Sequence, residues 1–527
     1  MTSKAGLHHV TGITGDPLAN LDFYVGLLGL RLVKRTVSHS DSRTLHLFYG
    51  DADARPGTLL SFFAWPDTAS GRRGYGQAAE VGLVVPRSSV GAWTQHLLAK
   101  GVRFEGPTEV GDTSRISLQD PDGLPLVLVG VADAPDGRPW VGSSLPSEMQ
   151  PRGLHHVTLW TEVPAQTGHT LTRHLGFEAA ENEGGLLTYR AKSDGSGAEL
   201  GHTVYVRDVS GFWSAADGVG TLHHVAFRTN DAVSEARILE AVRLDGLTVS
   251  EVREHGYFRS IYFREPGGCL LEVATDGPGF TLDEDSATLG EKLVLPPELE
   301  PERQNIEVTL PTVALPGAPR YAARDLGWIH RFVSGTQPLT LLLLHGTGGN
   351  ELDLLAFGRR VAPGANLLSV RGRSLEEGSP RFFRRYSPVL YDQDDLRAEA
   401  AALALFVQDA ADLYGLEQAS VVALGYSNGA NIALATLVQN PKVYAGAVLL
   451  RPVMVLENPL QVALAGLPVL VLSGLEDEFL PLAEPVTPYL RALGADVAEE
   501  RLNAGHELTP EDETSSAAWL GRFAHSG

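Results

Sequence analysis

Residues 7–14 read LHHVTGIT, and the same pattern returns as LHHVTLWT at residues 154–161 and as LHHVAFRT at residues 222–229. In each copy Val and Thr alternate with apolar positions, which is typical of a β-strand. A fourth, degenerate copy, AAEVGLVV at residues 78–85, precedes a helix-like stretch and strands that end in DPDGLPLVLVG. The copies predict four repeated units, each built from a strand, a helix and about three further strands.

These units close with DPDGLPLVLV at residues 120–129 or EPGGCLLEVAT at residues 265–275. In this they resemble the vicinal-oxygen-chelate superfamily, which includes glyoxalases and extradiol dioxygenases, and the resemblance covers about residues 5–280. It implies an α+β fold of βαβββ modules, in which two modules pair into a cup-shaped sheet around a metal. We expect modules 1 and 2 in residues 1–145 and modules 3 and 4 in residues 150–285.

The resemblance implies that metal ligands come from the first and last strands of a module. Module 1 then offers His9, module 3 offers His156, and module 4 offers both His224 and Glu272. Two histidines and one carboxylate are typical of a non-haem Fe(II) site with positions open for substrate and O₂, and Mn(II) accepts the same ligands. Module 2 is expected to be blank, with Val81 at the first-strand position and Val127 at the last.

The third ligand is either His9 or His156, depending on which modules pair. Residues 257–280 (YFRSIYFREPGGCLLEVATDGPGF) and 295–311 (LPPELEPERQNIEVTLP) resemble the hydroquinone-type ring-cleaving dioxygenases. In that family the first-module histidine is the ligand, so the resemblance favours His9.

Each ligand histidine belongs to a His-His doublet. Because side chains alternate along a strand, only one histidine of a doublet can point straight at the metal. His8 and His223 are therefore structural or lie behind the ligands. The resemblance implies that His8 and Thr11 contact substrate and that His223 and Tyr262 act in catalysis. The family tends to have an Arg where this sequence has His255, which bears on how anions are handled there.

Other functions fit the first 280 residues as well. A metal-dependent isomerase or lyase of the glyoxalase type would use the same ligands, and a non-catalytic module would bind a small molecule without turning it over. Dependence on oxygen separates these alternatives from a dioxygenase.

The pattern changes after a Pro- and Glu-rich stretch, residues 286–324, that is expected to form a tail and linker. Residues 325–527 alternate apolar strands with amphipathic helices, which predicts an α/β domain. The runs LTLLLL, NLLSV, SVVAL, AGAVLL and LPVLVLS are unbroken, as strands buried on both faces of a parallel sheet are.

GYSNG at residues 425–429 joins the run SVVAL to a helix-like stretch. A bare G-x-S-x-G is weak evidence, but strand, turn and helix are the setting of a nucleophile elbow, which predicts Ser427 as the nucleophile. Asp477 in SGLEDEFLP and His506 in AGHELT follow in the order of an α/β hydrolase triad. The spacing G-x-x-D-x-x-x-P favours Asp477 over its neighbours Glu476 and Glu478.

The oxyanion of such a hydrolase needs N–H donors, and we expect them from the backbone of Thr347, in HGTGGN, and of Asn428. The stretches LLHGTGGNELDLL, RGRSLEEGSPRFFRR and ALGYSNGANIA resemble the small phospholipase/carboxylesterase family, and within it the hydrolases associated with hydroquinone resistance. Phe382, Phe383 and Arg384 either line the acyl pocket or pack and cap a helix.

Composition restricts the partners. The formal charge of −22 repels nucleic acid and anionic membrane surfaces, and no run of about 20 apolar residues is present to span a membrane. No signal-peptide pattern is seen, and one cysteine, Cys269, allows no internal disulfide or Cys-based metal site, so we expect a cytoplasmic protein. The oligomeric state, including a homo-oligomer, stays open.

The sequence as a whole therefore predicts a bifunctional enzyme. An Fe(II) site would open a small hydroquinone-type ring with O₂, and a serine carboxylesterase would cleave a small ester or other acyl substrate. The alternative is a glyoxalase-like or non-catalytic module fused to a carboxylesterase.

Overall fold

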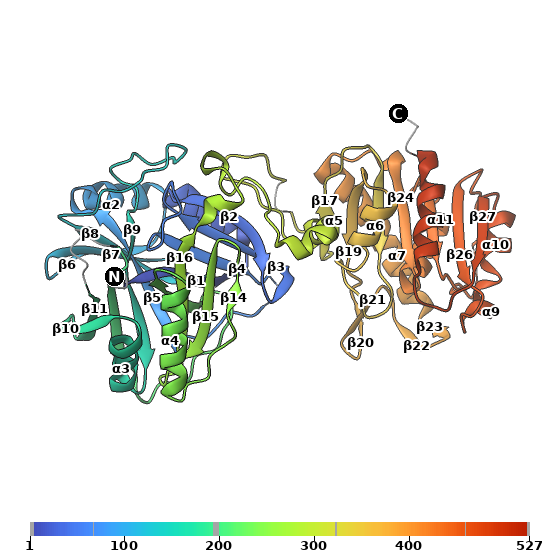
Figure 1. Ribbon diagram of the computed structural model, residues 1–527. Helices are drawn as coiled ribbons and strands as arrows, with labels where there is room; N and C mark the ends of the chain where they lie inside the picture. The colour runs from blue at the N-terminus through green and yellow to red at the C-terminus, as the bar shows by residue number, and fades with distance from the viewer. Residues whose placement is uncertain (1–4, 67, 193–199, 322–323, 459, 524–527) are drawn as a thin grey trace. The chain divides into compact units, whose positions relative to one another are not determined.

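The computed structural model describes residues 5–66, 68–192, 200–321, 324–458 and 460–523. The chain divides into two compact units (Figure 1). One comprises Met1–Pro301 with Leu310–Pro319, and the other comprises Glu302–Thr309 with Arg320–Gly527.

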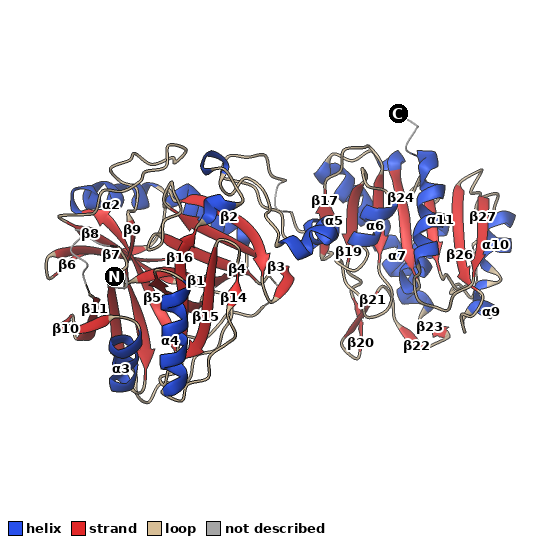
Figure 2. Ribbon diagram, in the orientation of Figure 1, coloured by secondary structure: helices blue, strands red, loops and turns tan. Residues whose placement is uncertain are grey.

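The first unit contains the four expected βαβββ modules (Figure 2), which confirms the α+β fold. Module 1 consists of β1 (Leu7–Thr14), α1 (Pro17–Leu21) continued by a π-helical turn (Asp22–Leu27), β2 (Arg31–Ser38), β3 (Asp41–Gly50) and β4 (Leu59–Ala64). Module 2 consists of β5 (Gln77–Pro86), α2 (Val90–Ala99), β6 (Phe104–Val110), β7 (Thr113–Gln119) and β8 (Pro125–Val131). Module 3 consists of β9 (Gly153–Thr161), α3 (Pro164–His174), β10 (Phe177–Glu183), β11 (Leu186–Ala191) and β12 (Thr203–Asp208). Module 4 consists of β13 (Leu222–Thr229), α4 (Ala232–Leu244), β14 (Arg253–Glu254), β15 (Phe258–Arg264) and β16 (Leu270–Pro278).

The modules pair across the sequence into two eight-stranded sheets. Module 1 joins module 4 in the order β14-β15-β16-β13-β1-β4-β3-β2, and module 3 joins module 2 in the order β10-β11-β12-β9-β5-β8-β7-β6. In each sheet the first strands of the two modules are antiparallel neighbours, β1 with β13 and β9 with β5. The pairing therefore places the first and fourth modules, not consecutive ones, around one centre.

The strand register corrects one expectation about module 2. Thr11 lies opposite His224 in the first sheet, and Thr158, its counterpart in the LHHVT repeat, lies opposite Glu80 in the second. Glu80 thus holds the place of His224, and the expectation that Val81 holds it was wrong by one residue. A shift of one residue moves a side chain to the other face of the sheet. The side chain on the face that corresponds to the His224 face is therefore the carboxylate of Glu80, and not the apolar Val81.

The second unit is built on a seven-stranded sheet in the order β17-β19-β18-β24-β25-β26-β27, parallel except for the edge strand β17. Its strands are β17 (His330–Val333), β18 (Thr340–Leu344), β19 (Asn366–Val370), β24 (Val421–Tyr426), β25 (Gly446–Leu450), β26 (Pro468–Gly474) and β27 (Asp496–Leu502). Two short hairpins lie between β19 and α7 (Gln393–Tyr414) along the chain. One pairs β20 (Ser374–Glu376) with β21 (Ser379–Arg381), and the other pairs β22 (Arg385–Ser387) with β23 (Leu390–Tyr391).

Helices cover both faces of this sheet, as the unbroken apolar strands predict. One buried apolar cluster joins the sheet to α7 (Gln393–Tyr414), α8 (Asn428–Gln439) and α10 (Val486–Ala492). A second joins the opposite face to α6 (Leu355–Val361) and α11 (Pro510–Leu520). A short helix, α9 (Leu480–Ala483), follows β26.

The stretch at residues 286–324 is more regular than a linker. Its described residues include a three-residue 3₁₀ helix at Ser286–Thr288, a longer one at Pro297–Glu302, and α5 (Arg303–Thr309). Ile306 and Val308 of α5 are buried, and α5 packs against α6, so α5 belongs to the second unit. Within the described parts of the chain, no helix has the length and apolarity needed to cross a membrane.

Two candidate active sites

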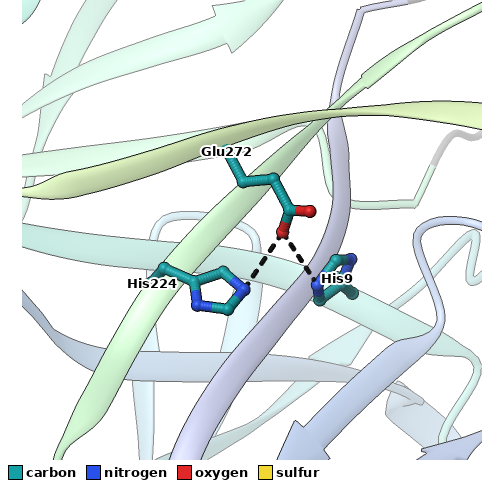
Figure 3. Close-up of side chains that lie close together, drawn as sticks. All are labelled: His9, His224 and Glu272. Atoms are coloured by element: carbon teal, nitrogen blue, oxygen red, sulfur yellow. Dashed lines mark ion pairs between the residues drawn. The ribbon is translucent and has the colours of Figure 1, made fainter. Parts of the chain in front are cut away.

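Three side chains from neighbouring strands of the first sheet converge on one point (Figure 3). His9 on β1 lies opposite Ala226 on β13, which in turn lies beside Glu272 on β16, and His224 is two residues before Ala226. Side chains two residues apart share a face, so all three point to the same side of the sheet. The Nε2 atoms of His9 and His224 lie 3.1 and 3.0 Å from Glu272 Oε2.

The chemistry of this cluster fits a metal ion. One donor atom from each of the three residues lies within 4.8 Å of the other two, and all three residues are buried. Although both imidazoles are close to Glu272, neither of its oxygens has a hydrogen-bond partner among the described residues. A buried carboxylate without hydrogen bonds is costly unless a cation balances it, which makes it a suitable ligand.

Protonation in the cluster also suits a metal. Burial raises the pKa of Glu272, but the adjacent His9 and His224 outweigh burial and hold this pKa well below its ordinary value. Burial lowers the pKa of His224. An ionised carboxylate and a neutral imidazole are the forms that bind metals.

The doublet partners lie behind the ligands. His8 Nδ1 is 2.9 Å from His9 Nδ1, and His223 Nδ1 is 2.8 Å from His224 Nδ1. If the Nε2 atom of each ligand keeps its lone pair for a metal, its Nδ1 carries the proton and donates it to the partner, which fixes the tautomer. The geometry thus places His8 and His223 within hydrogen-bonding distance of the rings of His9 and His224.

The other predicted residues of this site lie around His224. Thr11 Oγ1 is 2.9 Å from His224 Nε2 and 2.7 Å from Ser61 Oγ. The ring of Tyr262 packs edge-on against His224 at 5.4 Å, and burial together with Glu272 raises the pKa of its hydroxyl well above the ordinary value. His255 Nε2 lies 3.1 Å from Ser260 Oγ, and burial lowers the pKa of His255 to about 4.

His156 lies in the other sheet and takes no part in this cluster. Its Nε2 is 3.4 Å from Glu80 Oε1, which also accepts a hydrogen bond from Thr158. Val127 lies opposite Gly82 as Glu272 lies opposite Ala226, so the carboxylate position is apolar here. The second sheet therefore offers two donors where the first offers three.

In the second unit Ser427, His506 and Asp477 lie in the geometry of a serine triad. Ser427 lies between β24 and α8 with φ +52°, the strained backbone of a nucleophile elbow. His506 Nε2 is 2.9 Å from Ser427 Oγ, and its Nδ1 is 2.8 Å from Asp477 Oδ2. Nucleophile, base and orienting acid thus have hydrogen-bond geometry in the order expected from sequence. Glu476 and Glu478 make no such contact with His506 among the described residues.

The surroundings of Ser427 decide the role of RFFRR. Phe382 and Phe383 are fully buried in the apolar cluster, and the backbone N–H of Arg384 donates to Asp395 in the first turn of α7. These residues pack and support a helix instead of lining a pocket. A cavity of about 250 Å³ does open at Ser427, and Thr347 and Asn428 line it, as expected of oxyanion donors.

Three arginines at this cavity were missed by sequence reasoning: Arg381, Arg385 and Arg451. The RFFRR stretch held the signal for the first two, since charged residues beside buried phenylalanines must find partners or a polar cavity. Arg451 follows β25 with φ +53° and pairs with the buried Asp512 at 2.7 Å. It also donates to the carbonyls of Gly505 and Glu507, which flank His506.

Known proteins resemble both units of the chain. Residues 6–128 and 153–273 match the family described as "Glyoxalase/Bleomycin resistance protein/Dioxygenase superfamily". "Putative ring-cleaving dioxygenase MhqO" of Bacillus subtilis is 36% identical over 57% of this chain and 94% of its own length. "Chlorohydroquinone/hydroquinone 1,2-dioxygenase" of Sphingobium indicum is 30% identical over 56% of this chain and 92% of its own length. "Putative hydrolase MhqD" of Bacillus subtilis is 40% identical over 36% of this chain and 96% of its own length. The sequence-based resemblance of both halves is thus confirmed.

Proposed function

This chain belongs to the glyoxalase/bleomycin resistance protein/dioxygenase superfamily, and we propose that its first unit opens the ring of a hydroquinone-type aromatic with O₂. The observation that carries the proposal is the convergence of His9, His224 and Glu272 on one buried point. These three residues would hold Fe(II), and Mn(II) is the alternative metal. The bound metal would supply open positions at which substrate and O₂ meet.

The remaining residues of this site bind and orient. Phe258 lies 5.4 Å from the His9 ring, Phe48 lies 6.2 Å from it, and Phe63 lies 6.4 Å from the His224 ring. Such an aromatic surround suits a flat aromatic substrate. We propose that Thr11 and Tyr262 contact the substrate and that His8 and His223 fix the ligand tautomers. Because its pKa is raised, the hydroxyl of Tyr262 stays protonated and can donate a hydrogen bond to the substrate.

For the second unit we propose a serine carboxylesterase. His506 takes the proton of Ser427 as the hydroxyl attacks an acyl carbon, and Asp477 holds the imidazole in the tautomer that can accept it. The N–H groups of Thr347 and Asn428 would donate to the developing oxyanion. Because both units occupy one chain, we further propose that they act on one aromatic compound in sequence, in the cytoplasm, where the single buried Cys269 stays reduced.

The dioxygenase is tested by comparing equivalent positions in the two sheets of the first unit. The full chain is loaded anaerobically with Fe(II), hydroquinone is added, and O₂ uptake and bound iron are measured. His224→Ala should abolish both readouts, and Glu80→Ala, the same position in the other sheet, should change neither. Absence of uptake in the wild type, or undiminished iron in His224→Ala, refutes the assignment, and turnover without O₂ points to the glyoxalase-type alternative.

The esterase is tested separately with p-nitrophenyl acetate. Ser427→Ala should lose essentially all Ser-dependent hydrolysis while iron content and O₂ uptake stay at the wild-type level. Full esterase activity in this variant shows that the nucleophile lies elsewhere.

A further inference from the structure

The cavity at Ser427 is lined by both charged and apolar residues. Three of its lining residues are arginines, and it also has apolar walls, including Pro388, Val453 and Phe479. A guanidinium in a small pocket binds carboxylates well because its planar donors match two carboxylate oxygens. Only an arginine whose N–H donors are not already used within the protein can bind such a ligand.

Arg451 is occupied by the protein itself. Its Nη1 and Nη2 donate to the two oxygens of Asp512 at 2.7 and 2.9 Å, and its Nε and Nη2 donate to two carbonyls. The negative charge of Asp512 neutralises the positive charge of Arg451. Arg451 therefore holds structure and does not receive an anion.

Arg381 and Arg385 share one counter-ion. The Nε of Arg385 lies 2.9 and 3.0 Å from the two oxygens of Glu376, and the Nε of Arg381 lies 3.3 Å from one of them. Two positive charges thus face one negative charge, which leaves about one positive charge at the pocket. The pKa of Arg381 is lowered by burial and then by the charge of Arg385, so the pair repels itself where no further anion is bound.

Donors of these two arginines stay available. Among the described residues, neither Nη atom of Arg385 has a hydrogen-bond partner, and Arg381 uses Nη1 on Thr347 Oγ1 at 2.7 Å. Thr347 is the residue whose N–H is expected in the oxyanion hole. The positive charge therefore lies beside the expected oxyanion hole, within the cavity of about 250 Å³ at Ser427.

We propose that the hydrolase is specific for short acyl groups that carry a free carboxylate, such as monoesters or thioesters of dicarboxylic acids, and that Arg385, with Arg381, binds this carboxylate. The inference rests on the proposed nucleophile Ser427. In the reaction water is added across the acyl bond, which releases an alcohol or thiol and a dicarboxylate, and no further reactant is needed.

The proposed substrate class also fits the first unit. Insertion of both atoms of O₂ between a hydroxylated ring carbon and its neighbour turns the first carbon into a carboxyl group and the second into a carbonyl group. Every product of such a cleavage is a carboxylate with a second carbonyl function. A pocket with spare positive charge would bind carboxylates of this kind and disfavour neutral esters. Such a product shares the carboxylate with the proposed substrates but has no ester or thioester bond, so a separate acyl-forming reaction must come between the two units before the hydrolase can act.

The experiment compares the p-nitrophenyl monoester of succinic acid with p-nitrophenyl butyrate, which has the same acyl length and no charge. The full chain is used, and the Ser427→Ala variant serves as the blank for spontaneous hydrolysis. Arg385→Gln should lower kcat/KM for the monoester by about ten- to hundredfold, the range of a hydrogen bond to a charged group, and change it by less than about twofold for butyrate. Arg384→Gln is the matched control, because Arg384 pairs with Asp392 and Asp395 outside the cavity, and both rates should hold.

A second variant should increase the preference for the charged monoester over butyrate. Glu376→Gln removes the shared counter-ion and should raise the preference for the monoester, and added salt should weaken that preference. If Arg385→Gln changes both esters equally or neither, or if Glu376→Gln lowers the preference, the proposed specificity is wrong. If Ser427→Ala still hydrolyses the esters, the nucleophile assignment fails instead, so the two failures are distinct.

Discussion

Removing the carboxylate of Asp512 should damage the hydrolase in two measurable ways. Arg451 and Asp512 are fully buried, and their side chains form a two-point ion pair at 2.7 and 2.9 Å. Asp512→Ala leaves a buried guanidinium without a counter-ion, which costs about 3–5 kcal/mol. For a unit of this size 1 kcal/mol lowers the melting temperature by about 2–4 °C, so the transition of the second unit should fall by about 6–20 °C.

The second effect concerns catalysis. Arg451 donates to the carbonyls of Gly505 and Glu507, on either side of His506, and these bonds fix where the imidazole lies. A double variant, Arg451→Met with Asp512→Leu, removes both charges and should regain much of the lost stability, since an apolar pair often replaces a buried ion pair without loss. It also loses the capping contacts of Asp512 with Thr509, which limits the recovery. Its kcat on p-nitrophenyl acetate should stay low.

Calorimetry of the full chain measures the first effect, and esterase kinetics measures the second. The O₂ uptake and iron content of the first unit are the internal control and should not change. A shift of less than about 2 °C in Asp512→Ala refutes the energetic argument. Wild-type kcat in the double variant shows that Arg451 does not position His506.

Three shorter predictions concern other parts of the molecule. Burial raises the pKa of Asp120 to about 6, so between about pH 4 and 6 the folded state binds more protons than the unfolded one, and stability should fall as the pH rises. Asp120→Asn should abolish this loss of about 3 kcal/mol, measured by urea unfolding at pH 4 and pH 7.5. A Cβ at Gly429 would lie 1.9 Å from the carbonyl oxygen of Leu344, so Gly429→Ala should abolish esterase activity while O₂ uptake is retained. Removal of the metal by a chelator should lower the melting temperature of the first unit only, because a ligand held at 100 times its Kd adds about 2.7 kcal/mol, and a Glu272→Ala variant should show no such response.

Local pattern was enough to predict most of the architecture. The LHHV copies and their closing strands predict four modules, and the apolar runs predict the central strands of the seven-stranded sheet, because each signal lies within one element. The triad residues could also be found, since each sits at a fixed place relative to a strand end. The periodicity of apolar residues and the spacing of motif residues are local properties of the sequence, and the observed elements agree with both.

Long-range relations were not accessible in the same way. Whether His9 or His156 joins His224 depends on which modules pair, and the repeats are too alike to decide this without a family resemblance. The regular structure of α5 was missed because Pro-rich flanks hide a seven-residue helix whose apolar side chains are buried only against α6. Arg381 and Arg385 were missed because they flank the buried phenylalanines of RFFRR in sequence. Arg451 was missed because the cavity that it lines is formed by distant segments.

The position of Glu80 shows how little separates the two sheets of the first unit. Both have a histidine at the same place in the LHHV strand and a threonine two residues later, opposite a polar side chain on the partner strand. In the second sheet, however, Glu80 replaces one histidine and Val127 replaces the carboxylate. A carboxylate beside one imidazole makes a single polar contact, as Glu80 and His156 do at 3.4 Å. Two imidazoles and a carboxylate leave three potential metal-binding atoms facing one point. The same strand pattern thus yields a closed polar contact in one sheet and a candidate metal site in the other.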